Sequence, residues 1–128
     1  MTLEHFLDPL DATSSFYESL KKGGTLCLVV HNHRSLVNRI LGRRSPIIDL
    51  EHVQLFSPKS ITSLLRRVGF RELAIKSFPN SYPLAYWIKL SPLPLRLKSL
   101  IDRLLQLLRL QEFVISLPVG NICVTAVK

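Results

Sequence analysis

Glycine, cysteine and aromatic residues are scarce in this chain of 128 residues. The five glycines form no Gly-x-Gly turn between a strand and a helix, so the chain has no glycine-rich loop of the kind that brings backbone N–H groups close to a nucleotide. Two cysteines are too few for a disulfide scaffold. Because Cys27 and Cys123 both lie in apolar runs, we predict buried free thiols and no metal site.

Long apolar runs are also missing. No uninterrupted run approaches the about 20 residues that a bilayer-spanning helix requires, and Met1-Thr2-Leu3-Glu4 does not begin a secretory signal. A hydrophobic content of 47% nevertheless supports one domain with one core. The sequence therefore predicts a cytoplasmic protein, with peripheral association at a membrane kept open.

Acidic residues are few, at 9 against 17 lysines and arginines, which gives a net charge of +8. This excess favours anionic partners through long-range attraction. Nucleic acid is disfavoured because aromatic residues make up only 8% of the chain and no recognition motif is present. Two interpretations stay open for the basic residues: they solvate helix faces, or they contact anionic lipid or a lipid-linked substrate.

The first elements carry clear end signals. Asp8 and Pro9 are typical of a helix start, and Gly23-Gly24 is typical of a helix end. The run Thr25–Val30 is continuously apolar and of strand length. Continuity without alternation predicts a strand that is covered on both faces, as in a parallel sheet flanked by helices.

Polar residues follow this strand at His31-Asn32-His33. Loops at the carboxyl ends of strands line the ligand crevice in open α/β sheets, so these residues are candidates for a site. The plainer interpretation is that they only solvate a loop. Residues 36–41 then predict a short amphipathic helix that ends at Gly42.

A second polar stretch, Glu51-His52, precedes another well-marked helix. Ser57 and Pro58 predict its start and Gly69 its end. An acid and a histidine here form a candidate acid/base pair.

The second half predicts two strands with an insertion between them. Residues 71–78 and 121–127 are strand-like, while 81–119 begins with aromatic residues and continues into a leucine-rich helix over 97–108. We therefore predict a single partial domain over 1–128, with a core of 1–80 and 120–128 and a helical insertion over 81–119.

The order of these motifs resembles the C-terminal half of a class I S-adenosylmethionine-dependent methyltransferase. The resemblance is carried by Leu3-Glu4-His5, by Glu51-His52 with Leu55-Phe56-Ser57, and by the elements between and after them, and it covers residues 3–78. It is similar to the branch with Leu-Glu-His after strand four and Glu-His-x-x-Leu-Phe-Ser after strand five. His31-Asn32 stands where this branch has Pro-Asn.

The resemblance implies an α/β fold that is half of a Rossmann-like domain. Its three strands would follow the order five, seven, six, with the last strand antiparallel. Strand 25–30 would then have an unpaired edge, which implies a complementing chain or self-association. The glycine-rich turn and the acidic ribose-binding residue of the family have no counterpart here, so we expect the chain to be inactive alone.

The resemblance also assigns site residues. Glu4 and His5 would lie beside S-adenosylmethionine, and Asn32 and Glu51 would face the methyl acceptor. His52 is the first candidate for a catalytic base and His31 the second, with a structural role for His52, fastening its loop to the first helix, as the alternative. Three aromatic residues of the insertion are candidate walls of the acceptor pocket: Tyr82, Tyr86 and Trp87.

The sequence is compatible with two classes of function. In one, the chain is a methyltransferase fragment whose acceptor is a small molecule or a lipid- or sugar-linked group. In the other, it is a non-enzymatic module that binds a membrane surface or a partner through the basic, leucine-rich helix within 95–113.

Overall fold

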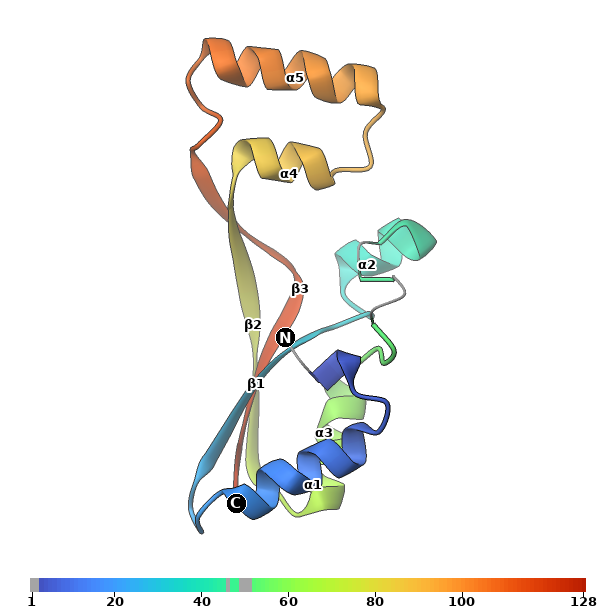
Figure 1. The fold of residues 1–128 in the computed structure, drawn as a ribbon, viewed down its shortest axis with the longest axis vertical. Coiled ribbons are helices and arrows are strands. Elements are labelled where there is room, and N and C mark those ends of the chain that lie inside the picture. Colours follow the sequence, from blue (N-terminus) through green and yellow to red (C-terminus); the bar gives the residue numbers. More distant parts are fainter. Residues whose placement is uncertain (1–2, 46, 49–51) are drawn as a thin grey trace. The chain divides into compact units, whose positions relative to one another are not determined.

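The computed structural model describes residues 3–45, 47–48 and 52–128. These residues form an α/β fold in which three strands carry helices (Figure 1). The elements are η1 (Leu3–His5), α1 (Pro9–Ser19), β1 (Thr25–His31), α2 (Leu36–Leu41), η2 (Gly42–Arg44), α3 (Pro58–Val68), β2 (Arg71–Pro83), α4 (Leu84–Leu90), α5 (Leu95–Leu107) and β3 (Val114–Val127).

The sheet has the order β1-β3-β2, which is the predicted order of strands five, seven and six. β1 and β3 are antiparallel, and their register pairs Thr25 with Val127 and His31 with Asn121. The predicted fold class is therefore confirmed.

Helices α1 and α3 begin where the sequence predicts. The Asp8 carboxylate accepts hydrogen bonds from the N–H groups of Leu10 and Asp11 at 2.9 and 3.0 Å. Ser57 and Ser60 form a reciprocal capping box at α3, and Gly69 ends that helix in a left-handed conformation, with φ of 117°. These local bonds stabilise the starts of both helices independently of tertiary packing.

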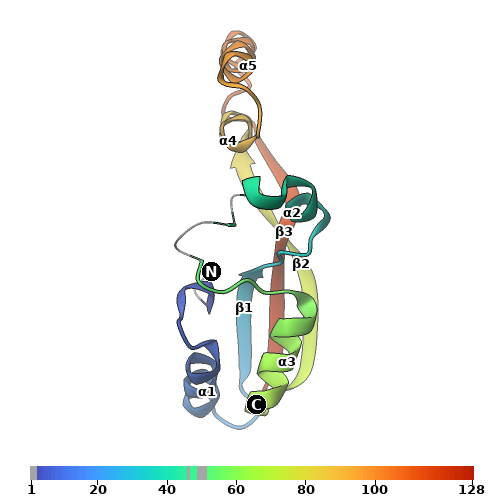
Figure 2. The ribbon, with the colours of Figure 1, turned by 90° about the vertical axis from the view of Figure 1, so that its right-hand side faces the viewer.

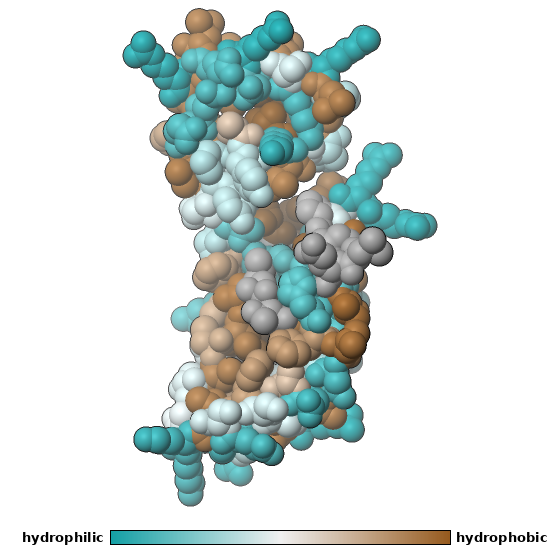
Figure 3. All heavy atoms as spheres, viewed as in Figure 1, coloured by the Kyte–Doolittle hydropathy of each residue, from teal (hydrophilic) through white to brown (hydrophobic). Residues whose placement is uncertain are grey.

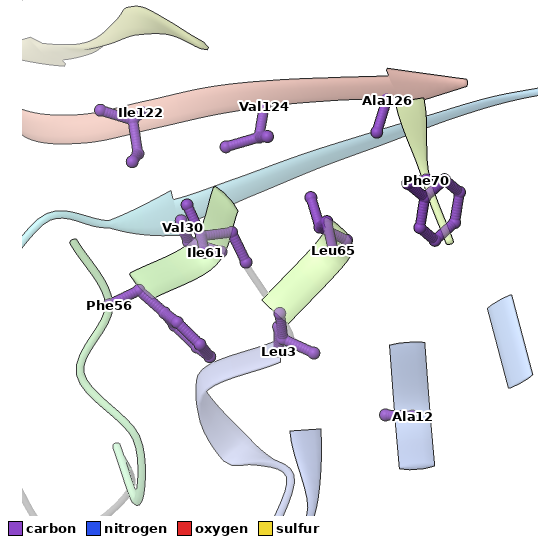
Figure 4. Close-up of a cluster of buried hydrophobic side chains, with 10 residues drawn as sticks. All are labelled: Leu3, Ala12, Val30, Phe56, Ile61, Leu65, Phe70, Ile122, Val124 and Ala126. Carbon is purple, nitrogen blue, oxygen red and sulfur yellow. The ribbon is translucent and has the colours of Figure 1, made fainter. Parts of the chain in front are cut away.

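Both helices pack against each other and lie on the same side of the sheet (Figures 1 and 2). The core forms between them and the inward side chains of β1 and β3 (Figure 4). Its members are Leu3, Ala12, Val30, Phe56, Ile61, Leu65, Phe70, Ile122, Val124 and Ala126.

The prediction that β1 is covered on both faces is wrong for the described part of the chain. Val30 is fully buried and Leu26 packs against the core, whereas the alternating residues Thr25 and Cys27 are exposed. The run of apolar residues is continuous, but only one side of it meets α1 and α3. The thiols are free as predicted but not buried, since Cys27 is exposed and Cys123 is half-buried.

The chain divides into two compact units. Met1–Phe78 with Pro118–Lys128 forms the first, and Pro79–Leu117 forms the second. Strands β2 and β3 are longer than the predicted 71–78 and 121–127, because both continue into the second unit, where α4 and α5 pack against each other. Among the described residues, no helix has the length and apolar character needed to cross a membrane.

Candidate functional site

The polar residues of the first unit gather at the carboxyl end of β1. Glu4 is fully buried in η1, and its Oε1 accepts a hydrogen bond from the backbone N–H of His31 at 2.8 Å. The Glu4 carbonyl accepts a second bond from the N–H of Gln54 at 3.1 Å. One residue thereby ties the N-terminal turn to the end of β1 and to the segment that precedes α3.

Three imidazole rings gather near the end of β1, with His52 in contact with the other two. The ring of His52 stacks on the ring of His5 with a centroid separation of 5.0 Å, and it meets the ring of His31 edge-on at 5.0 Å. The structure therefore brings together four residues that the sequence singled out, Glu4, His5, His31 and His52. His31 and His52 are half-buried and His5 is exposed, so the cluster opens toward solvent.

Asn121 belongs to this cluster, although the sequence did not single it out. Its Oδ1 lies 2.6 Å from Nδ1 of His31. Because an amide oxygen only accepts, Nδ1 of His31 carries the proton and the lone pair of a neutral ring is at Nε2. Asn121 is 3% exposed, so burial holds it in place. The sequence signal was an asparagine at the start of an apolar strand, but its partner lies 90 residues away.

Asn32 has a structural part in the same region. Its Oδ1 accepts a hydrogen bond from the N–H of Arg34 at 3.0 Å, which closes a tight turn after β1. Its backbone N–H donates to Gly120 and it forms a parallel bridge with Phe56. The side chain and the backbone of Asn32 therefore both hold this turn.

Gly120 is required by this arrangement. Its φ is +114°, and a Cβ at this position would overlap Oγ of Ser35 and lie 2.8 Å from Nδ2 of Asn38. Asn38 is itself buried, and its Nδ2 donates to the carbonyl of Asn32 at 2.8 Å. The start of α2 can therefore pack onto β3 only where the strand has no side chain.

Four predicted site residues remain, Glu51 and three aromatic residues of the second unit. Glu51 is outside the described residues, so its predicted role stays a prediction. The rings of Tyr82, Tyr86 and Trp87 form a cluster in the second unit, where Tyr82 is 4.7 Å from Tyr86 and 5.3 Å from Trp87 between centroids. Nε1 of Trp87 donates to the carbonyl of Ile115 at 3.1 Å, which fixes this ring.

The second unit contains a cavity of about 570 Å³ that α4 and α5 line. Tyr86 lines it, together with charged side chains that include Lys98 and Asp102. Lys98 donates to the carbonyl of Lys89 at 2.7 Å, and Asp102 accepts from Gln111 at 3.1 Å. These bonds orient the Lys98 and Asp102 side chains within the second unit.

The polar cluster at the end of β1 combines acidic, imidazole and amide side chains. Within the ranges that the structure describes, no group of three or more acidic, histidine or cysteine side chains is arranged to hold a metal ion. The described groups that can carry chemistry are a carboxylate, three imidazoles and an amide.

A comparison with protein-family models matches residues 1–75 to a methyltransferase domain. This match covers more than half of the chain and includes the whole imidazole cluster. The chain belongs to the methyltransferase domain family. The resemblance that the sequence motifs indicated is thereby confirmed.

Solved structures support the same fold. An S-adenosylmethionine-dependent methyltransferase from Thermotoga maritima matches with a TM-score of 0.59 and 20% identity, over 100% of this chain and 53% of that protein. A second such enzyme, from Archaeoglobus fulgidus, matches with a TM-score of 0.55 and 21% identity, over 99% of this chain and 56% of that protein. The chain thus spans about half the length of these methyltransferases. No curated protein gives a significant match.

Proposed function

We propose that this chain forms the acceptor side of a methyltransferase site and becomes active when the remainder of the methyltransferase fold is supplied. The acceptor would be a small molecule or a lipid- or sugar-linked group. The observation that carries the proposal is the convergence of His5, His31 and His52 with Glu4 at the carboxyl end of β1. In α/β sheets, this end of the strands is where ligands bind.

The proposed chemistry is proton removal from the acceptor. S-Adenosylmethionine supplies an electrophilic methyl group, and an acceptor hydroxyl attacks it more readily when a base takes its proton. We propose His52 as the base and His31 as the second candidate. The bond from Nδ1 of His31 to Asn121 supports the second assignment, because it directs the basic Nε2 away from the amide.

Glu4 and His5 are the proposed cofactor contacts of this chain. Oε2 of Glu4 is buried and has no hydrogen-bond partner in the described part of the chain. A buried carboxylate oxygen is strongly stabilised by a donor, and the cofactor carries both ammonium and hydroxyl donors. One carboxylate and one imidazole are nevertheless too few to bind a nucleoside tightly, and we therefore propose that the chain alone is inactive.

Tyr82, Tyr86 and Trp87 are the proposed walls of the acceptor pocket. Tyr86 is 41% exposed and lines the cavity of the second unit, so it can contact a ligand there. Trp87 is fixed by its bond to Ile115 and would support the neighbouring rings. This unit lies outside residues 1–75 of the family match, and we propose that the acceptor specificity resides in it.

Calorimetric titration with S-adenosylhomocysteine tests the claim that the isolated chain is incomplete. We expect a dissociation constant above about 1 mM for residues 1–128, because the chain offers few contacts. Micromolar binding by the isolated chain, abolished by Glu4→Gln, would show that the cofactor site is complete here and would refute this part of the proposal.

Turnover of a completed enzyme tests the base. In a chimaera that joins residues 1–128 to the part of the Thermotoga methyltransferase that this chain does not cover, cofactor consumption is measured with a panel of alcohols and amines. His52→Ala should lower the turnover rate about 100-fold or more. The control is His33→Ala: Nδ1 of His33 lies 2.6 Å from the Phe56 carbonyl, so this change should lower stability and leave turnover unchanged. Full turnover in His52→Ala would rule out His52 as the base.

A further inference from the structure

Helix α5 packs against α4 through one face only. Ile101 and Leu105 are half-buried on this face, and Lys98 donates to α4 at the carbonyl of Lys89. These positions follow the spacing of three and four residues that places side chains on one side of a helix. This face of α5 is therefore the one that packs within its own unit.

A second apolar stripe on α5 has no partner among the described residues. Leu100, Leu104 and Leu107 are 65%, 54% and 80% exposed, at spacings of four and three. Leu97 and Leu108 are 41% and 54% exposed and extend the stripe at both ends. A solvated helix face is normally polar, so a row of five exposed leucines indicates a surface that binds something apolar.

Basic residues border this stripe. Arg96 and Arg103 are seven residues apart, which places them in one row along α5, next to Leu100 and Leu104. Both arginines are exposed, whereas Lys98 is bonded to α4. Residues 79–117 hold five lysines and arginines against two acidic residues. Hydrophilic side chains project beside hydrophobic atoms over this unit (Figure 3).

We propose that α5 is a membrane-docking helix that lies along an anionic lipid surface. Its leucine stripe enters the interface between headgroups and acyl chains, and Arg96 and Arg103 contact lipid phosphates. With 13 residues, α5 is about 20 Å long, which is shorter than the about 30 Å hydrocarbon core and suits an orientation parallel to the surface. The charge pattern selects lipid over a purely apolar protein partner, because the border of the stripe is basic.

Vesicle flotation of the full chain tests this proposal. The wild-type chain should float with vesicles of 70% phosphatidylcholine and 30% phosphatidylserine and remain in solution with phosphatidylcholine alone. Arg96→Gln with Arg103→Gln should weaken binding about 30-fold, since each basic residue near an anionic surface contributes about fivefold. Leu100→Ser with Leu104→Ser should also weaken binding at least tenfold.

Two matched controls distinguish a specific effect of α5 on vesicle binding from a general effect of net charge or of exposed apolar side chains. Lys21→Gln with Lys22→Gln removes the same charge from an exposed turn of the first unit. Leu36→Ser with Ile40→Ser removes an equally spaced pair from α2 that is 72% and 75% exposed. Both controls should float like the wild-type chain.

Three outcomes would overturn the proposal. The first is a wild-type chain that does not float with anionic vesicles. The second is an equal loss of binding in the controls. The third is a dimer that Leu100→Ser with Leu104→Ser dissociates while flotation persists, which would make the stripe a contact between two copies. None of these outcomes bears on the imidazole cluster, so the methyltransferase proposal would stand or fall separately.

Discussion

At the scale of single residues, Gly120 and Asn121 decide how β3 meets the end of β1. Gly120 leaves room for Ser35 and Asn38, and Asn121 fixes the proton of His31. Both residues lie where β3 pairs with the end of β1 and with the turn that follows it. Two neighbouring residues thereby join a folding requirement to the candidate site.

Gly120→Ala should destabilise the fold by about 2–4 kcal/mol, because the new methyl group adds a steric clash to an unfavourable positive φ. The control is Gly23→Ala, where φ is +78° and nothing lies within 4 Å of the added Cβ. That change should cost only about 1–2 kcal/mol. Urea unfolding measures both; equal losses would show that backbone strain, and not the contact with α2, explains Gly120.

The contact between the two thiols leads to a prediction about the reactivity of Cys123. Sγ of Cys27 lies 3.5 Å from Sγ of Cys123, and the hydrogen bond with Cys27, together with burial, raises the pKa of Cys123. A raised pKa leaves less reactive thiolate at pH 8. Cys27→Ala should therefore lower the pKa of Cys123 and speed its alkylation by iodoacetamide, followed by mass spectrometry.

Lys76 provides a control of opposite sign, because its positive charge lowers the pKa of Cys123. Adding Lys76→Met to Cys27→Ala should raise the pKa again and slow alkylation. If both changes shift the rate in the same direction, general opening of the sheet would be the better explanation.

At the scale of elements, α3 is the best-specified part of the chain. The N–H of Ser60 donates to Oγ of Ser57 at 3.1 Å, and the N–H of Ser57 donates to Oγ of Ser60 at 2.8 Å. The helix then presents Ile61 and Leu65, both fully buried, to the sheet. Local capping and tertiary packing thus favour the same conformation.

Ser57→Ala should lower the free energy of unfolding by about 1 kcal/mol, because the N–H of Ser60 loses its acceptor, Oγ of Ser57, at the start of α3. Ser63→Ala, at an exposed position within the same helix, is the control and should be neutral or slightly stabilising. A loss of similar size at both positions, measured by thermal melting, would contradict the capping argument.

The sequence predicted where helices and strands begin better than it predicted which elements pack against them. The caps at Asp8 and Ser57 are local chemistry, so the starts of α1 and α3 could be read directly. The family motifs supplied the strand order, which no local pattern contains. The prediction that β1 is covered on both faces was wrong, because an apolar run indicates which residues can be buried and not which elements pack against them.

The candidate site was predictable in part for a similar reason. His5, His31 and His52 stood out as polar groups at strand ends and in a family motif. The role of Asn121 depends on a contact between residues far apart in the chain, and α4 follows a proline-containing stretch that predicts no helix. Neither feature has a signature in its own neighbourhood.

At the scale of the whole molecule, the free edge of β1 should control solubility. β1 pairs with β3 on one side, and it is the end strand of the sheet. An unpaired apolar edge favours association with another chain, so we expect concentration-dependent oligomers in sedimentation velocity. A charge at the outward-facing half-buried Val29, introduced by Val29→Lys, should reduce their fraction.

Thr125→Lys on β3, an interior strand of the sheet, is the control for that experiment, because a charge there leaves the edge of β1 unchanged. A monodisperse monomer at all concentrations would refute the association.

The pairing of β1 with β3 also determines when the sheet can form. Cys27 and Cys123 face each other across 96 positions of sequence. At about 5–20 residues per second, synthesis of that interval takes about 5–20 s, whereas a ten-residue loop closes in under a microsecond. During translation, β1 therefore has no partner strand until β3 is synthesised, long after α1 has formed. The sheet is therefore most exposed to chaperones and to misassembly before β3 has been synthesised.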